Sequence, residues 1–219
     1  MSENLLKAKE SVLYACKKMS EKGYALGTSG NISARVEGEN LFVITPSSYS
    51  YEKMTLEDLV VSDMDGNVVE GFRKPSVEFD MHRFILMTRP EVNSVIHTHS
   101  RYATAAGSIE GLDSVPAVDI ETALYLGGDI PVAPFAAPGS LELAANIRDN
   151  IGKSFGIIMA NHGAIGIGKS MDEAMFSADN VERTCEMYLA LKACGEFRPL
   201  PKEYLEKTRA GFLTRNKIQ

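Results

Sequence analysis

The chain has 219 residues, of which 44% are apolar and 24% are charged, and its formal net charge is −6. These values predict an ordinary globular protein of one large domain or two small ones. The negative charge gives no electrostatic reason to expect a nucleic acid or an anionic membrane as a partner, although it does not exclude a local site for an anionic substrate.

Targeting signals and paired cysteines are both missing from the pattern. The first residues, MSENLLKAKE, are charged and lack the apolar core of a signal peptide. No apolar run reaches the roughly 20 residues that a membrane-spanning helix needs. The three cysteines, Cys16, Cys185 and Cys194, form no paired framework, so we expect free thiols in a reducing compartment. We therefore expect a cytoplasmic protein that has no membrane partner.

The first half of the chain begins with a predicted helix. Apolar side chains recur at helical spacing over residues 3–22, and Gly23 supplies a stop signal. The glycine-rich turn GTSGN then leads into short strands, and residues 60–71 predict a β-hairpin. A second helix is predicted to start at Pro75 and to end before Pro90. The segment VNSVIHTHS, which follows, is a predicted strand.

The second half is harder to assign at its start, because glycine and proline interrupt residues 114–135. Residues 140–151 predict a helix, and residues 155–168 predict two short strands joined by a turn. A long helix over 170–194 begins with capping-box spacing and ends at a glycine. A charged tail follows from about residue 196. Helices and strands mix throughout without a linker or repeat, which predicts a single α/β domain over residues 1–219.

Two of the four histidines lie one residue apart in the predicted strand SVIHTHS. Since residues two apart in a strand point to the same face, His97 and His99 project together. Two neutral imidazoles on one face can bind one divalent metal. His162, at the end of another apolar strand, is a candidate third ligand. The alternative is a set of hydrogen-bonded histidines without a metal.

The segment KPSVEFDMH adds a carboxylate and the fourth histidine. Glu78 is expected in the first turn of its helix, where the helix dipole favours a negative charge. It is a candidate metal ligand, and a helix-start role alone is the alternative. His82 lies four residues later on the same helical face. The sequence leaves open whether His82 is a ligand, a partner of a ligand or a packed ring.

Three short segments are candidates for binding a phosphate. GTSGN and TPSS offer glycines and hydroxyls whose turns can direct backbone N–H groups at an anion. Ser76 lies near a predicted helix N-terminus, which also favours anions. Each segment alone is more typical of an ordinary turn than of a phosphate site, and the GxxxxGK[ST] phosphate loop is absent.

Taken in order, the motifs GTSGNIS, ITPSS, KPSVEFDMH and VIHTHS, the stretch GGDIP and the motif NHGAI resemble those of the class II aldolase and adducin-head family. The resemblance runs from about residue 5 to about residue 193, and the L-fuculose-1-phosphate aldolases are the most similar group. It implies an α/β fold of a single three-layer αβα domain with a central, largely antiparallel sheet. It also implies a homotetramer, since members of the family are usually tetramers.

The resemblance also implies a site. It implies Zn²⁺, or another divalent metal, held by His97, His99 and His162, with Glu78 close by as a ligand or base. It implies a phosphorylated sugar as the small-molecule partner, with its phosphate bound around Gly30, Asn31, Ser47, Ser48 and Ser76. The implied reaction cleaves a ketose 1-phosphate to dihydroxyacetone phosphate and an aldehyde, through a metal-stabilised enediolate that Glu78 protonates.

The sequence departs from the fuculose-phosphate aldolase pattern at three positions. Val77 replaces a second serine in the phosphate motif, and Ser48 stands where glycine is common. Ile120 stands where a catalytic tyrosine is expected. The candidate replacements for that tyrosine are Asp119, Glu121 and Tyr204.

Several other activities share the metal pattern. Within the family they are the L-ribulose-5-phosphate 4-epimerases, which commonly have aspartate at the Glu78 position, the methylthioribulose-1-phosphate dehydratases and the oxo-tetronate-phosphate decarboxylases. An adducin-head-like interaction module would lack the metal site, whereas all three histidines and the glutamate are present here. A generic zinc hydrolase is a further alternative, and the phosphate motifs favour the aldolase over it.

Overall fold

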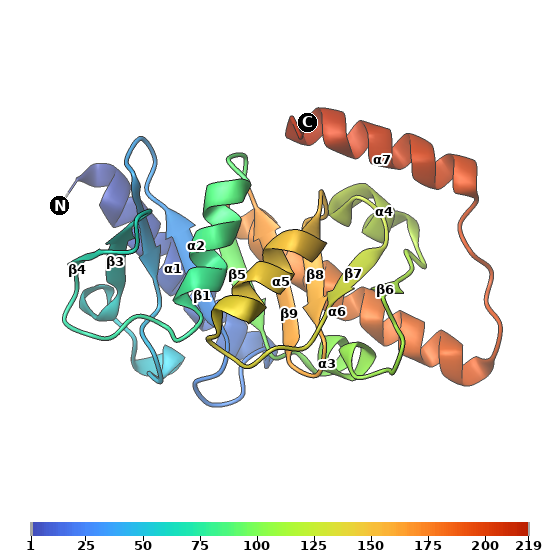
Figure 1. Ribbon diagram of the computed structural model, residues 1–219, viewed down its shortest axis with the longest axis horizontal. Coiled ribbons are helices and arrows are strands. Elements are labelled where there is room, and N and C mark those ends of the chain that lie inside the picture. The colour runs from blue at the N-terminus through green and yellow to red at the C-terminus, as the bar shows by residue number, and fades with distance from the viewer. Residues whose placement is uncertain (1, 219) are drawn as a thin grey trace.

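The computed structural model describes residues 2–218 (Figure 1). Within this range, nine strands form one sheet in the order β4-β3-β2-β1-β5-β9-β8-β7-β6. The pair β7–β8 is parallel, and every other neighbouring pair is antiparallel. The predicted α/β class with a largely antiparallel central sheet is therefore confirmed.

The strands are short and most of them are buried. They are β1 (Asn31–Arg35), β2 (Leu41–Ile44), β3 (Val60–Asp63), β4 (Val68–Glu70), β5 (Ser94–Thr98), β6 (Ser114–Val115), β7 (Ile130–Ala133), β8 (Gly156–Met159) and β9 (Gly163–Gly168). The helices are α1 (Glu3–Lys22), α2 (Phe79–Thr88), α3 (Arg101–Gly107), α4 (Ile120–Leu126), α5 (Leu141–Ile151), α6 (Met171–Cys194) and α7 (Lys202–Asn216). Among residues 2–218, no helix is both long enough and apolar enough to cross a membrane.

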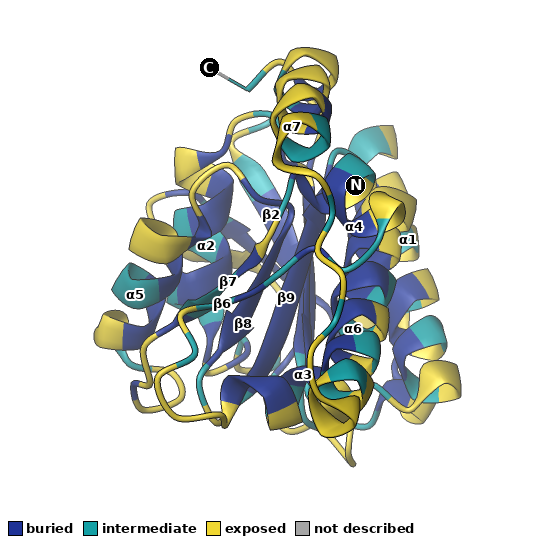
Figure 2. Ribbon diagram, turned by 90° about the vertical axis from the view of Figure 1, so that its right-hand side faces the viewer, coloured by how far each residue is buried: buried dark blue, intermediate teal, exposed yellow. Residues whose placement is uncertain are grey.

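Helices cover both faces of the sheet, which confirms the three layers (Figure 2). Helices α2 and α5 pack on one face, and α1 and α6 pack on the other. The alternation of side chains along β5 supplies both faces, because Val95 belongs to the buried cluster under α2 and Ile96 to the cluster under α1. His97 has the same parity as Val95, so it points toward the face that α2 covers.

Local signals explain most helix boundaries. The Ser2 hydroxyl accepts a hydrogen bond from the Leu5 N–H at the start of α1, and Gly23 ends that helix with φ 69°. Ser170 caps α6 in the same way, as its spacing predicts.

The stretch 114–135, which the sequence patterns left unassigned, contains β6, α4 and β7. All three cysteines are free thiols.

The tail after residue 196 contains a helix that the sequence patterns did not reveal. Helix α7 packs against α4, and the Phe212 ring fits against Gly127, where a Cβ would lie 2.7 Å from it. Arg209 donates a hydrogen bond to the carbonyl oxygen of Gly127. These contacts hold α7 along the upper edge of the molecule in Figure 1, whereas α3 lies at the lower edge.

The predicted start of the second helix is wrong by several residues. Residues 74–76 are extended and pair with residues 45–47: the Ser47 N–H donates to Lys74, and the Ser76 N–H donates to Thr45. Helix α2 therefore begins at Phe79. Glu78 is its N-cap residue rather than a member of the first turn, and its side chain makes no capping hydrogen bond. The carboxylate is thus free to point elsewhere.

Candidate active site

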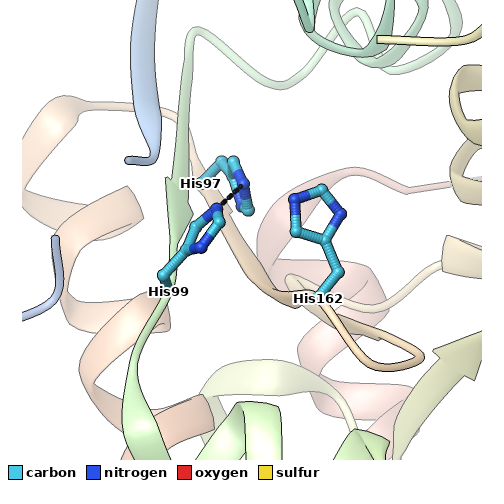
Figure 3. Close-up of side chains that lie close together, drawn as sticks. All are labelled: His97, His99 and His162. Atoms are coloured by element: carbon cyan, nitrogen blue, oxygen red, sulfur yellow. Dashed lines mark hydrogen bonds between the residues drawn. The ribbon is translucent and has the colours of Figure 1, made fainter. Parts of the chain in front are cut away.

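Three histidines converge where β5 ends beside the β8–β9 turn (Figure 3). His97 lies in β5, His99 directly follows it, and His162 precedes β9. The Nε2 atoms of His97 and His99 are 3.0 Å apart, and the three ring centroids lie 4.7–4.9 Å from one another. One ring nitrogen from each histidine lies within 4.8 Å of the others. The structure thus brings the three predicted metal ligands together.

Two glycines permit this close approach of chain segments. A Cβ at Gly163 would lie 2.1 Å from the Thr98 carbonyl oxygen, so only glycine lets the β8–β9 turn meet the end of β5. Gly30, with φ 79°, lies against the backbone of β5, and a Cβ there would be 2.6 Å from the His97 carbonyl oxygen. Both glycines therefore position the backbone that carries the imidazoles.

The Glu78 carboxylate reaches the same point from the start of α2. Its Oε2 lies 3.2 Å from His97 Nε2, and its Oε1 lies 3.3 Å from His162 Nε2. The Oε1 atom is nevertheless buried without a hydrogen-bond partner, as is His162 Nδ1. Glu78 Oε1 therefore lies beside the imidazoles without a hydrogen-bond donor among the described residues.

The protonation states favour a cation at this point. Burial and the neighbouring His97 lower the pKa of His99 and of His162 to about 4, so both are neutral at pH 7. Burial lowers the pKa of His97, but the Glu78 carboxylate and the hydrogen bond to the Ala164 carbonyl together raise it above its ordinary value. Burial would raise the pKa of Glu78, but His97 and Asn31 hold it well below its ordinary value. The site therefore combines a carboxylate anion with imidazoles, and the carboxylate stabilises positive charge at this point.

These groups fit one divalent metal. The His97 Nδ1–H donates to the Ala164 carbonyl, 3.0 Å away, which leaves the Nε2 lone pair directed at the other ligands. Three imidazole nitrogens, with a carboxylate beside them, form a donor set that suits Zn²⁺ and other first-row divalent ions. The unpartnered Glu78 Oε1 could serve as a further oxygen donor or remain free to act as a base.

His82 lies behind this group rather than in it. Its ring is completely buried, with Nε2 2.5 Å from Asn31 Oδ1 and Nδ1 2.7 Å from Ser33 Oγ. Burial lowers the pKa of His82 to about 3. Of the alternatives that the sequence left open, this geometry disfavours a metal ligand, because Asn31 and Ser33 already engage both ring nitrogens; His82 is linked to Glu78 only through Asn31.

A cavity of about 250 Å³ opens beside the histidines. The residues expected to hold phosphate line it together with Glu78, His99 and His162; they are Gly30, Asn31, Ser47, Ser48 and Ser76. The lining also includes Thr28, Ser29, Pro46, Val77 and Pro138, which were not among the predicted site residues. Thr28 and Ser29 belong to the GTSGN motif, whereas Pro138 lies on a loop distant in sequence and gave no signal.

Two residues that depart from the family pattern, Ser48 and Val77, line this cavity. Ser48 has φ 54°, a left-handed conformation that glycine adopts more easily, which explains why glycine is common there. Val77 is 65% exposed, so this apolar side chain forms part of the cavity rim where a second hydroxyl was expected.

The candidate replacements for the missing tyrosine do not line this cavity. Asp119 caps α4 and, like Glu121, forms an ion pair with Arg183. Tyr204 belongs to α7, which lies over α4 (Figure 1). Within the part of the chain that the structure describes, these three residues therefore lie outside the wall that carries the histidines.

Comparison with known proteins agrees with this geometry. Residues 10–189 match the family model described as "Class II Aldolase and Adducin N-terminal domain". The chain belongs to the class II aldolase family. A solved structure of an L-fuculose 1-phosphate aldolase matches this member with a TM-score of 0.89 and 32% identity, covering 97% of each chain.

Curated relatives of this class II aldolase family member have different names. A 5-deoxy-D-ribulose 1-phosphate aldolase from Bacillus thuringiensis serovar kurstaki is 33% identical over 208 residues, which are 95% of this chain and 96% of that protein. A 3-oxo-tetronate 4-phosphate decarboxylase from Haemophilus influenzae is 31% identical over 191 residues, which are 85% of this chain and 89% of that protein. The predicted family is confirmed, and the named activities share phosphorylated substrates.

Proposed function

We propose that the protein is a metal-dependent aldolase that cleaves a ketose 1-phosphate, similar to L-fuculose 1-phosphate or 5-deoxyribulose 1-phosphate, into dihydroxyacetone phosphate and an aldehyde. The observation that supports this most is the shared cavity of about 250 Å³, whose wall joins hydroxyl- and glycine-rich turns to Glu78, His99 and His162. A substrate that spans this wall has its phosphate at one end and its reacting carbons beside the imidazoles.

The phosphate end of the wall uses neutral donors. None of the described residues that line the cavity is a lysine or an arginine. Ser76 Oγ accepts a hydrogen bond from the Glu78 N–H, which leaves its own hydroxyl proton free to donate to a phosphate oxygen. Ser47 and Ser48 present their hydroxyls side by side, 3.4 Å apart. Gly30 also lines this wall, and a glycine turn can direct backbone N–H groups at an anion.

The reacting end depends on Glu78. A divalent metal held by His97, His99 and His162 would supply Lewis-acid chemistry that makes a carbon next to a carbonyl acidic. Cleavage breaks the C3–C4 bond and turns the C4 hydroxyl into a carbonyl. The proton that leaves this hydroxyl passes, directly or through water, to the ionised Glu78 carboxylate, and C3 gains a proton in its place. In this proposal Glu78 returns that proton to C3. The supporting geometry is that its unpartnered Oε1 borders the histidines while its Oε2 accepts a hydrogen bond from Asn31.

The experiment that tests this proposal is a substrate screen. Metal-loaded protein is incubated with 5-deoxyribulose 1-phosphate, L-fuculose 1-phosphate, L-ribulose 5-phosphate and the matching unphosphorylated sugars, and dihydroxyacetone phosphate is measured. We expect release from a ketose 1-phosphate and none from the free sugars. Epimerisation of L-ribulose 5-phosphate without any release of dihydroxyacetone phosphate would replace the aldolase with a 4-epimerase.

A second candidate is decarboxylation of a 3-oxo-tetronate 4-phosphate, which is favoured by the Haemophilus influenzae relative that has this activity in its name. It would use the same acidifying metal and the same phosphate wall, and release of carbon dioxide distinguishes it. We also propose a cytoplasmic homotetramer, and light scattering of the purified protein tests the tetramer.

A further inference from the structure

The side chain of Asn31 is already engaged within the protein. It is 4% exposed, and its Nδ2 donates a hydrogen bond to Glu78 Oε2 at 2.7 Å. Its Oδ1 lies 2.5 Å from His82 Nε2. An amide has one carbonyl oxygen and two N–H donors, so His82 occupies the acceptor and Glu78 occupies one of the two donors. The Asn31 amide therefore already has hydrogen-bond partners within the protein, unlike a side chain whose polar atoms are free to bind phosphate.

The Glu78 carboxylate fixes the direction of every bond in this chain of groups. A carboxylate only accepts hydrogen bonds, so the Asn31 amide must turn its nitrogen toward Glu78 and its carbonyl toward His82. His82 must therefore carry its proton on Nε2 and donate it to Asn31. The unprotonated Nδ1 then accepts from the Ser33 hydroxyl, 2.7 Å away. The bond network thus assigns one tautomer to His82.

The far end of this chain of hydrogen bonds is enclosed by the protein. Ser33 and His82 are both 0% exposed, and Ser33 lies in β1 while His82 lies in α2. The Ser33–His82–Asn31 path therefore connects a central strand to the carboxylate through groups that packing already holds in place. An anchored Oε2 fixes the plane of the carboxylate and leaves Oε1 as the reactive oxygen.

We propose that Ser33, His82 and Asn31 form a neutral hydrogen-bond relay that orients the Glu78 carboxylate, and that the Asn31 side chain is a positioning residue rather than a phosphate ligand. The inference rests on the proposed aldolase function for its kinetic part only. Its structural part, the His82 tautomer and the independence of phosphate binding from the Asn31 amide, holds whatever the reaction is.

The first measurement needs no substitution. Long-range nitrogen–proton correlation NMR of histidine-labelled, zinc-loaded protein shows which ring nitrogen of His82 carries the proton. Zinc is suitable because it has a filled d shell and no redox chemistry. We expect the proton on Nε2. A proton on Nδ1, or on both nitrogens, would overturn the relay.

The second measurement separates positioning from phosphate binding. Calorimetric titration of inorganic phosphate into metal-loaded Asn31→Ala and Ser76→Ala proteins measures the affinity of the cavity wall for phosphate without turnover. We expect Asn31→Ala to keep the parent affinity for phosphate and to lower kcat by about 10- to 100-fold, as loss of a ligand's hydrogen-bond partner does. Weaker phosphate binding with kcat retained would show that Asn31 is a phosphate ligand after all.

The third measurement is rescue at His82. A leucine there fills the buried space but donates no hydrogen bond, whereas a glutamine places an amide nitrogen near the position of Nε2. We expect His82→Leu to lose kcat as Asn31→Ala does, and His82→Gln to recover most of it with KM unchanged. Equal losses in both, with metal retained, would refute positioning through the donor. If the parent protein neither cleaves ketose phosphates nor exchanges protons of dihydroxyacetone phosphate, the aldolase proposal fails, and the tautomer and phosphate titrations still decide the relay.

Discussion

The two ends of helix α2 both carry buried polar atoms without a hydrogen-bond partner, yet only one end has the features of an active site. At the N-terminal end these atoms are Glu78 Oε1 and the nearby His162 Nδ1, and at the C-terminal end the atom is Arg89 Nη2. The helix has 10 residues, so the two ends are about 15 Å apart. The two ends of this one helix can therefore be compared directly.

At the Arg89 end, hydrogen-bond donors are matched by acceptors of the protein. The guanidinium donates to the carbonyl oxygens of Gly152 and Ser154, and its Nε pairs with Glu91 at 2.5 Å. Its centre lies 5.7 Å from the Phe155 ring centroid, within the range of a cation–π contact. Donors meet acceptors, and the result is a clamp between α2 and the loop that precedes β8.

The Glu78 end is different because acceptors meet acceptors beside a cavity. Three imidazoles and a carboxylate converge, and the two orphaned atoms belong to this group. A single unpartnered atom is therefore weak evidence of a ligand, whereas several converging lone pairs with an open wall beside them are strong evidence. Substitutions at the two ends should differ accordingly, with the largest effect on activity at the imidazoles and the smallest at Arg89.

The largest effect is expected from removing an imidazole. The parent protein should contain about one divalent metal per chain, and His97→Ala and His99→Ala should each lose most of it and, with it, the activity. Elemental analysis of the purified proteins measures the metal. Full metal occupancy in both variants would show that the histidines are only a hydrogen-bonded cluster.

Glu78→Gln should have the next largest effect. The amide keeps nearly the same shape but cannot act as a base, so turnover should fall by about two to four orders of magnitude. The variant should fold and retain metal on the three histidines. Exchange of the C3 protons of dihydroxyacetone phosphate with deuterated water gives the decisive readout, since this half-reaction needs no aldehyde. Exchange at the parent rate would exclude Glu78 as the base.

Ser76→Ala should have a moderate effect that is confined to the phosphate. Loss of one charge-assisted hydrogen bond costs roughly 1.5–3 kcal/mol, so phosphorylated substrates should bind about tenfold more weakly or worse. The metal content should not change. The control is the unphosphorylated sugar, and equal activity of the parent protein on sugar and sugar phosphate would refute a phosphate site in this wall.

The pH dependence of stability should be smaller and should arise at the Glu78 end. The pKa values of His99 and His162 fall from 6.5 to about 4 on folding, so the unfolded chain binds more protons between these values. Stability should therefore decrease as the pH falls through that window, and the raised pKa of His97 opposes part of the decrease. Urea unfolding of metal-free protein measures it, with His162→Asn expected to flatten the slope. A midpoint independent of pH would contradict these pKa directions.

Sequence patterns were most informative where the determining signal is local. The period of two residues along β5 predicts that His97 and His99 project together, and caps predict the ends of α1 and α6. The start of α2 was misplaced because it depends on pairing between residues 74–76 and 45–47, which are distant in the chain. A serine and a proline near a helix favour an earlier start in isolation, and only the tertiary pairing overrides them.

The relay behind Glu78 could not be predicted for the same reason. Asn31 and His82 are separated by 51 positions and belong to different elements, so no periodicity relates them. The motif GTSGN suggests an anion site for Asn31, and the fold instead directs its amide to a carboxylate and a histidine. The family resemblance supplied the set of site residues, and the packing of α2 on the sheet determines which of them contact one another.

Substitution of Arg89 should have no effect on the chemistry, and this last prediction tests the comparison most directly. Arg89→Met fills much of the same space but leaves the Gly152 and Ser154 carbonyl oxygens without their donor. An unsatisfied buried group costs roughly 1–3 kcal/mol, so the free energy of unfolding should fall by about that amount. Because the clamp lies a helix length from Glu78, kcat, KM and metal content should match the parent at temperatures where the variant is folded. Urea unfolding measures the first expectation, and steady-state kinetics with elemental analysis measures the second. A loss of activity or metal in folded Arg89→Met would mean that α2 transmits changes from one end to the other, and the two ends would then have to be treated as one coupled unit rather than as a clamp and an active site.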